Sequence, residues 1–276
     1  MIRELASLTR TETVGFKNGF YFVNGRDNLY GERIEKDKLA NLKWKKFLRK
    51  IKYLQAAPYL RTVFASGSLA ANNPEPKSDF DVLILIKSGR LYTGRFFLWI
   101  ISSILGSRRG RFDLIAPDKL CFNHYLADNN LELSHKSLYV AQSVINLRPV
   151  IFSDKILESF STANGWVSGY CYNFKQVGKY RTARPVKTLI LLAKCGEFIL
   201  NNKFGDVVEK LLKAVQQGRI KKNPATYESG GRIIFTDKEL EFHPRSFERS
   251  VINNYNIAIK KMSIFGVMEE DSGLSK

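Results

Sequence analysis

The sequence contains few cysteines. Its 276 residues include Cys121, Cys171 and Cys195 and no others. An odd number of cysteines at such wide spacing excludes a disulfide framework and a cysteine-rich zinc site. The composition therefore fits a reducing compartment, and we expect a cytoplasmic protein.

Histidines and long apolar runs are also scarce. His124, His135 and His243 lie far apart and show no metal-ligand spacing, and the chain has neither a nucleophile-elbow motif nor a Walker-type loop.

The most apolar stretch, 96–105, is bounded by Arg95 and Arg108. Since a membrane span needs about 20 apolar residues, we predict a buried core helix there. Charges at positions 3, 4, 10 and 12 also argue against a signal peptide.

Positive charge is abundant instead. Lys and Arg number 44 against 26 Asp and Glu, which gives a formal net charge of +18. This excess indicates a polyanionic partner, which is a nucleic acid, a nucleotide or an acidic membrane. We favour RNA, DNA or a nucleotide over the alternative of a solvated basic surface. The basic residues cluster at 43–52, 108–111 and 219–222. In the first cluster they flank an apolar helical stripe, which is typical of a solvated outer face.

The hydrophobic pattern predicts an α+β fold, in which a small mixed sheet with helices is followed by a mainly helical C-terminal region. A helix over 28–54, strands over 60–65 and 80–86, and a helix over 91–105 come first. Another strand over 120–126 and a helix over 137–146 follow. We place domains at 27–148 and 149–267, with a boundary near Arg148-Pro149 and a frayed polar tail at 268–276.

Residues 1–26 form a separate N-terminal segment. Two β-rich runs flank Asn18-Gly19, which is a strong hairpin signal, and a short helix precedes them. Two interpretations stand. The segment is either the back half of a winged-helix module in a truncated chain, or a plain hairpin packed on the main domain.

The chemically informative segment is 63–86. A β-rich run ends in Gly67-Ser68, where glycine lets a phosphate approach the backbone and the following helical turn offers free N–H groups. Asp79 and Asp81 are two apart on a strand, so their carboxylates share one face. Paired carboxylates suit Mg²⁺, which proteins usually hold together with substrate phosphates. The alternative is a turn at Gly67-Ser68 and a capping role for Asp79, but Asp81 is costly in so apolar a strand without a partner.

Gly67-Ser68, the ten-residue gap and Asp79-Phe80-Asp81 resemble the signature of the DNA-polymerase-β-like nucleotidyltransferase superfamily. A looser likeness, through Phe20–Arg26, extends to prokaryotic nucleotidyltransferase-domain proteins with a winged-helix-like start and a helical C-terminal half. The resemblance implies transfer of a nucleoside monophosphate from an NTP to an acceptor, with Mg²⁺ or Mn²⁺ on Asp79 and Asp81. Gly67 and Ser68 would then seat the triphosphate.

The family usually supplies a third carboxylate from a neighbouring strand. Asp113 takes that position if the strand covers 112–116, whereas Asn123 takes it if the strand covers 120–126. An asparagine lacks the charge, which leaves open a non-catalytic nucleotide- or nucleic-acid-binding regulatory module. Arg90 and Arg95 follow the central strand at a distance from which they could reach a triphosphate, although solvated positions on a helix are the simpler expectation.

Overall fold

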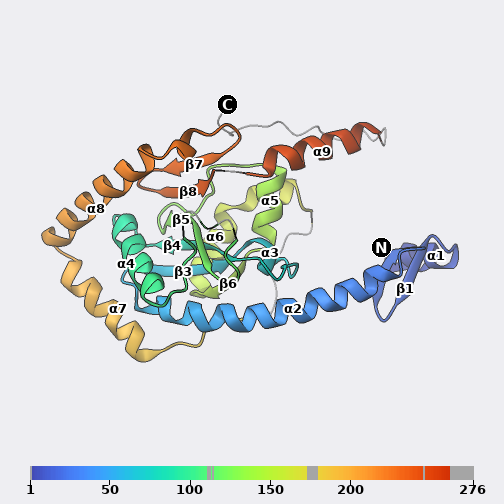
Figure 1. Cartoon of the computed structure of the whole chain (residues 1–276), viewed down its shortest axis with the longest axis horizontal. Helices are drawn as coiled ribbons and strands as arrows, with labels where there is room; N and C mark the ends of the chain where they lie inside the picture. Colours follow the sequence, from blue (N-terminus) through green and yellow to red (C-terminus); the bar gives the residue numbers. More distant parts are fainter. Residues whose placement is uncertain (1, 111–112, 114, 173–179, 245, 262–276) are drawn as a thin grey trace.

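The structure, a computed structural model, describes residues 2–110, 113, 115–172, 180–244 and 246–261. Its centre is a six-stranded mixed sheet in the order β6-β3-β4-β5-β8-β7 (Figure 1). The strands are β3 (Leu60–Ala65), β4 (Phe80–Ile86), β5 (Leu120–Ala127), β6 (Arg148–Ile151), β7 (Arg232–Phe235) and β8 (Glu239–His243). Only β4 and β5 pair in parallel, and the other neighbouring strands are antiparallel. The predicted α+β class is therefore confirmed.

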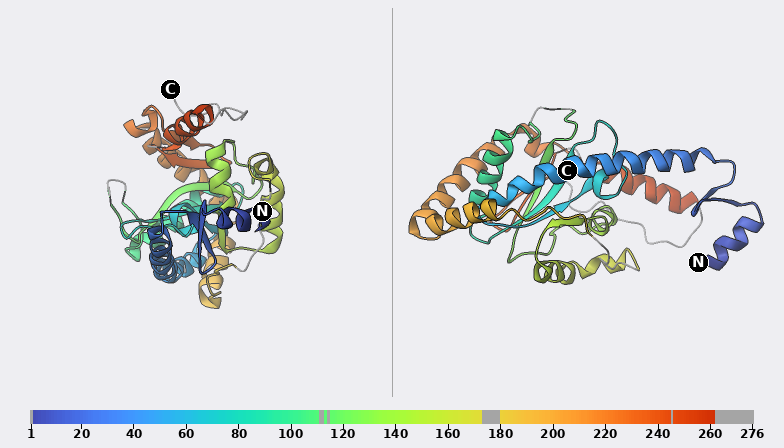
Figure 2. Two further views of the ribbon diagram at one scale, coloured as in Figure 1. Left: turned by 90° about the vertical axis from the view of Figure 1, so that its right-hand side faces the viewer. Right: turned by 90° about the horizontal axis from the view of Figure 1, so that it is seen from below.

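Alternating side chains of the sheet build two cores. On β4, Phe80, Val82 and Ile84 pack towards α2 (Asn28–Ile51) and α4 (Leu91–Ile104), whereas Leu83 and Leu85 pack towards the opposite face. That opposite face is covered by α5 (Leu138–Ile145) and α6 (Asp154–Ala163) (Figures 1 and 2). Because Asp81 lies between Phe80 and Val82 in the strand, it faces the α5 and α6 side.

The remaining described elements are short or peripheral. They are α1 (Ile2–Arg10), β1 (Val14–Lys17), β2 (Phe20–Val23), η1 (Lys52–Ala56), α3 (Gly67–Ala70), η2 (Gly165–Gly169), α7 (Lys187–Leu200), α8 (Lys203–Lys221), η3 (Pro224–Tyr227) and α9 (Glu248–Lys261). The predicted hairpin forms with Lys17 opposite Phe20, and Asn18 and Gly19 both have positive φ. The hairpin and α1 lie at the far end of α2, away from the sheet (Figure 1).

The C-terminal half contributes strands as well as helices. Strands β7 and β8 extend the sheet beyond β5, and β6 pairs with β3 at the other edge. The expected boundary near Arg148-Pro149 therefore falls inside an edge strand. A four-residue strand that contains a proline gives a weak sequence signal, and proline is tolerated there because an edge strand leaves one side unpaired. The predicted tail 268–276 and part of the alternative strand 112–116 lie outside the described residues.

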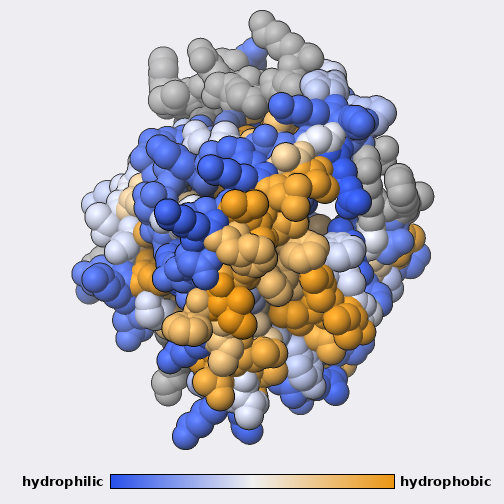
Figure 3. All heavy atoms as spheres, turned by 90° about the vertical axis from the view of Figure 1, so that its left-hand side faces the viewer, coloured by the Kyte–Doolittle hydropathy of each residue, from blue (hydrophilic) through white to orange (hydrophobic). Residues whose placement is uncertain are grey.

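Apolar side chains also gather on the outer face of α7 and α8 (Figure 3). Phe198 is 86% exposed, and Phe204, Leu211 and Leu191 are each more than half exposed. In the part of the chain that the structure describes, no helix combines the length and the hydropathy needed to cross a membrane.

Candidate functional site

The turn after β3 lies against the start of β4. The Ser66 N–H donates to the Asp81 carbonyl at 3.0 Å, and Gly67 has a φ of +62°. A β-carbon at Gly67 would collide with the carboxylate of Asp81. Glycine is therefore required here both for its backbone conformation and for the close approach of the acid.

The structure brings the two predicted aspartates together with a cysteine. Asp79 precedes β4 directly, Asp81 is its second residue, and Cys121 lies opposite Asp81 in the parallel ladder with β5. One ligand atom from each of the three lies within 4.8 Å of the others. Ser68 is half-buried and Gly67 exposed at the same place, so the cluster and the Gly67-Ser68 turn form one solvent-accessible group.

The carboxylates are crowded enough to change their acidity. Burial, and next the negative charge of Asp79, raise the pKa of Asp81 to about 6, although hydrogen bonds from Cys121 and Asn123 lower it in part. Burial and the two carboxylate charges also raise the pKa of the Cys121 thiol. Cys121 is therefore a neutral donor at neutral pH, and the pair of carboxylates is a site where a cation would be stabilised.

The structure places Asn123, and not Asp113, beside the pair. Asn123 Nδ2 donates to Asp81 Oδ1 at 2.9 Å from strand β5, which covers the second of the two predicted ranges. The Asp113 carboxylate instead accepts a hydrogen bond from the Gly110 N–H at 2.8 Å. Among the described residues, Cys121 and Asn123 thus lie beside the pair, and neither is a carboxylate.

Arg109 is a site residue that the sequence interpretation assigned only to a basic cluster. Its guanidinium donates to Asp79 Oδ2 at 2.5 Å, and it also holds the Asp113 carbonyl. Arg90 and Arg95 bond elsewhere, to Asp206 and Gln216 of α8. They support the packing of α4 against α8. The Arg90 side chain is only 12% exposed and Arg95 is half-buried, so the expectation of solvated positions is wrong for both.

The first basic cluster includes a buried lysine, Lys43, which holds the backbone next to Asp79. Lys43 is 2% exposed and donates to the Ser78 carbonyl at 2.8 Å and to Asp118 at 2.9 Å. Lys46 and Lys50 also bond Asp118, to its carboxylate and its carbonyl. The expectation of a solvated face is therefore wrong for Lys43, because it lies one helical turn from core residues of α2 and faces inward.

The site thus consists of an exposed glycine turn, two carboxylates, an arginine and two uncharged hydrogen-bond donors, Cys121 and Asn123. Its residues come from the ends of β3, β4 and β5 and from the loop before β5. The comparisons add no identification to this geometry: the chain was compared with protein-family models, with curated proteins and with solved structures, and no match was found in any of the three.

Proposed function

We propose that this chain is a Mg²⁺-dependent nucleotidyltransferase, which moves a nucleoside monophosphate from an NTP to an acceptor hydroxyl. The observation that carries the proposal is the convergence of the Gly67-Ser68 turn on the paired carboxylates of Asp79 and Asp81. The motif spacing in the sequence predicts this same convergence.

The donor set fits a hard divalent cation. Asp79 and Asp81 offer carboxylate oxygens on one face, and burial together with their mutual repulsion raises the pKa of Asp81. A bound Mg²⁺ would remove that repulsion, and it would stabilise charge on the phosphates and lower the pKa of the acceptor hydroxyl. Because Gly67 has no side chain, the backbone of the turn lies directly against the Asp81 carboxylate, so a phosphate held by the turn would lie next to the acids.

The chain's own residues then have separate roles. Asp79 and Asp81 hold the metal–triphosphate, Ser68 and the Gly67 backbone orient it, and Arg109 offsets negative charge that builds up at the site. In the reaction, the acceptor oxygen forms a bond to the α-phosphorus. The bond to the pyrophosphate oxygen breaks, and pyrophosphate leaves with that electron pair while the hydroxyl proton passes to solvent.

One observation favours a second candidate function. Cys121 and Asn123 are uncharged and stand where the resemblance implies a third carboxylate. A site of this kind would still bind a metal–triphosphate but would position the attacking oxygen poorly. The alternative is therefore a non-catalytic nucleotide-binding regulatory module, with RNA or DNA as a partner through the net charge of +18.

Binding of labelled ATP, and of the other three NTPs, should be measured by equilibrium titration with Mg²⁺ and with EDTA. We expect Mg²⁺-dependent binding that Asp79→Asn and Asp81→Asn each weaken by about 100-fold, while Asp237→Asn leaves it unchanged. Asp237 is a matched control because it is a largely exposed aspartate paired with Lys213. Wild-type binding in both aspartate variants would contradict the site.

Label transfer then separates the two candidates. The wild type should be incubated with α-labelled NTP and with RNA, protein and small-molecule fractions of a cell extract. Label on an acceptor that disappears in Asp81→Asn supports the enzyme. Mg²⁺-dependent binding without any transfer supports the module.

A further inference from the structure

A second polar cluster lies on the same sheet face, two strands from β4. Glu239 and Glu241 on β8 and Glu248 on α9 are all buried, with 3%, 3% and 1% of their surface exposed. Arg232 on β7 bridges two of them, at 2.8 Å to Glu241 and 2.5 Å to Glu248. Burial opposes the charged form of Glu248, but hydrogen bonds from His135 and Ser137 and the charge of Arg232 lower its pKa to about 2. The cluster therefore places three carboxylates out of water.

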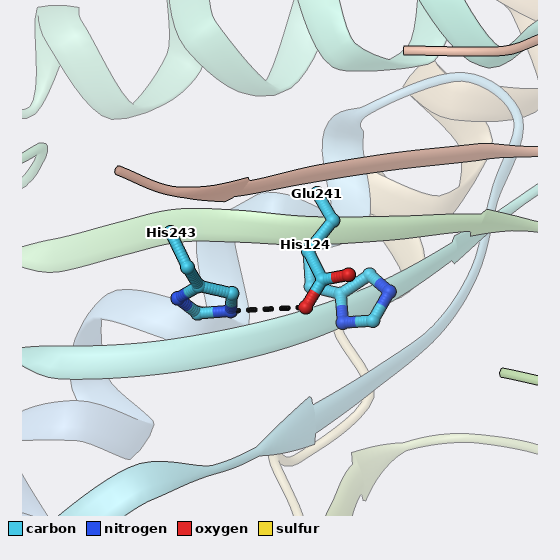
Figure 4. Close-up of side chains that lie close together, drawn as sticks. All are labelled: His124, Glu241 and His243. Carbon is cyan, nitrogen blue, oxygen red and sulfur yellow. Dashed lines mark ion pairs between the residues drawn. The ribbon is translucent and has the colours of Figure 1, made fainter. Parts of the chain in front are cut away.

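Two histidines that are far apart in the sequence meet at Glu241. His124 on β5 lies directly opposite Glu241 in the antiparallel ladder, and His243 is two residues further along β8 on the same face. The Glu241 carboxylate lies between the two imidazole rings (Figure 4). One ligand atom from each side chain lies within 4.8 Å of the others. Two adjacent strands thus present a histidine, a carboxylate and a histidine to one point.

The separations suit a tetrahedral metal ion. His243 Nε2 lies 3.4 Å from Glu241 Oε1. Two ligands that are each about 2.0–2.1 Å from a zinc ion, at a tetrahedral angle, are about 3.4 Å apart. Glu241 uses the same oxygen to accept from Arg232, but a carboxylate has two oxygens and several lone pairs, so it can hold both partners.

A neighbouring carboxylate also orients one of the histidines as a ligand. Glu239 Oε1 lies 2.8 Å from His124 Nε2, which is the carboxylate–histidine contact that commonly fixes a metal-binding imidazole and leaves its other nitrogen free. A third of the His243 side chain remains accessible to an ion from solvent.

We propose that His124, Glu241 and His243 bind one Zn²⁺-class transition-metal ion, which fastens β8 to β5. Imidazole nitrogens favour such ions over Mg²⁺, which prefers oxygen ligands, so this site differs in metal preference from the one at Asp79 and Asp81. A fourth coordination position remains for water. The inference goes beyond the proposed nucleotidyl transfer and does not depend on it.

The test uses the full chain, stripped of metal with a chelator and then titrated with Zn²⁺ against a chromogenic competitor. We expect one tight equivalent and a thermal midpoint that rises with Zn²⁺ concentration. His243→Gln and His124→Gln should each weaken Zn²⁺ binding by about 100-fold, and Glu239→Gln by about tenfold. His135→Gln is the matched control, because His135 bonds Glu248 instead and should leave the affinity within about threefold.

Two further measurements keep the outcome clear. The Asp79→Asn/Asp81→Asn double variant should retain the tight Zn²⁺ equivalent, so failure of the nucleotide site and failure of this site are distinguishable. Co²⁺ added to the wild type should give visible bands of a nitrogen and oxygen site without thiolate charge transfer. The proposal is overturned if no such bands appear, if a thiolate band shows that Cys121 binds the ion, or if His243→Gln binds Zn²⁺ as tightly as the wild type.

Discussion

The two polar clusters share one face of the sheet but differ in how the chain builds them. The carboxylates at Asp79 and Asp81 are two residues apart, next to a glycine turn that precedes them by about a dozen residues. His124 and Glu241 are 117 residues apart and meet because β8 pairs with β5. The first cluster is local, and its arginine, Arg109, bonds Asp79. The second cluster is long-range, and its buried arginine, Arg232, bonds both Glu241 and Glu248.

The carboxylates of the two clusters differ in the direction of their pKa shifts. Burial, and next the charge of Asp79, raise the pKa of Asp81. In the second cluster, burial also opposes the charged form of Glu241, but the charges of His124 and Arg232 and the hydrogen bond from Arg232 lower its pKa overall. We therefore expect the fold to tolerate removal of charge at the first cluster and to depend on charge at the second.

Gly67→Ala should have the largest effect on the first cluster. The substitution forces a β-carbon into φ +62° and against the Asp81 carboxylate, so we expect a loss of about 2–4 kcal/mol in the free energy of unfolding. Gly89→Ala is the matched control, because it also has positive φ, +71°, but meets nothing within 4 Å. It should cost about 1 kcal/mol in urea unfolding. Equal losses in the two variants would show that Gly67 does not press on the acid.

Asp81→Asn should stabilise the metal-free protein. The folded pKa of about 6 is above the ordinary value of 3.8, so the unfolded chain ionises this group first as the pH rises. The stability that a protonated Asp81 contributes is present below about pH 4 and is lost as the pH rises through about 6. In EDTA we expect the variant to be more stable than the wild type by about 1–3 kcal/mol at pH 8, and by little at pH 4.

Urea unfolding at the two pH values measures this difference. Glu241→Gln is the contrasting variant, because its loss leaves Arg232 with one buried partner fewer, and it should destabilise the fold. If Asp81→Asn is destabilising at pH 8, the fold depends on charge at both clusters, and the proposed difference between them is wrong.

The sequence predicts those parts of the molecule whose signals are local. Strands 60–65 and 80–86 are found at the predicted residues, and the hairpin turns at Asn18-Gly19, because alternation and turn residues act over a few positions. The pairing of Asp79 with Asp81 follows from the period of a strand in the same way. Lys43 was misjudged because helical spacing alone does not show that Asp118 lies opposite it.

Features that depend on sheet order could not be predicted. Strand β6 is short and contains Pro149, and β7 and β8 lie more than 100 residues after β5, so no periodic signal places them in one sheet. The meeting of His124 with His243 depends on that order. The same holds for Asn123, whose place beside Asp81 requires the parallel register of β4 with β5.

Of the substitutions Gly67→Ala, Asp81→Asn and Asn123→Asp, the last should have the smallest effect. It tests whether the two clusters act as separate sites. The new carboxylate would join Asp79 and Asp81, and we expect Mg²⁺–NTP affinity to rise about tenfold, or about 1.4 kcal/mol. Any acceptor labelling should rise with it. Zn²⁺ affinity at the neighbouring His124 should stay within about threefold, since Asn123 bonds Asp81 and does not belong to the group formed by His124, Glu241 and His243.

Asp113→Asn provides the control for this substitution. Its carboxylate bonds the Gly110 N–H, so its removal should change Mg²⁺–NTP affinity less than twofold. Isothermal titration calorimetry of both variants with Mg²⁺–NTP and with Zn²⁺ gives the four binding affinities that this comparison needs. If Asp113→Asn abolishes nucleotide binding and Asn123→Asp changes nothing, the third position lies in the loop before β5 and not on the strand. If Asn123→Asp instead weakens Zn²⁺ binding as much as His243→Gln does, the two clusters act as one site, because a charge added to one would then be felt in full by the other.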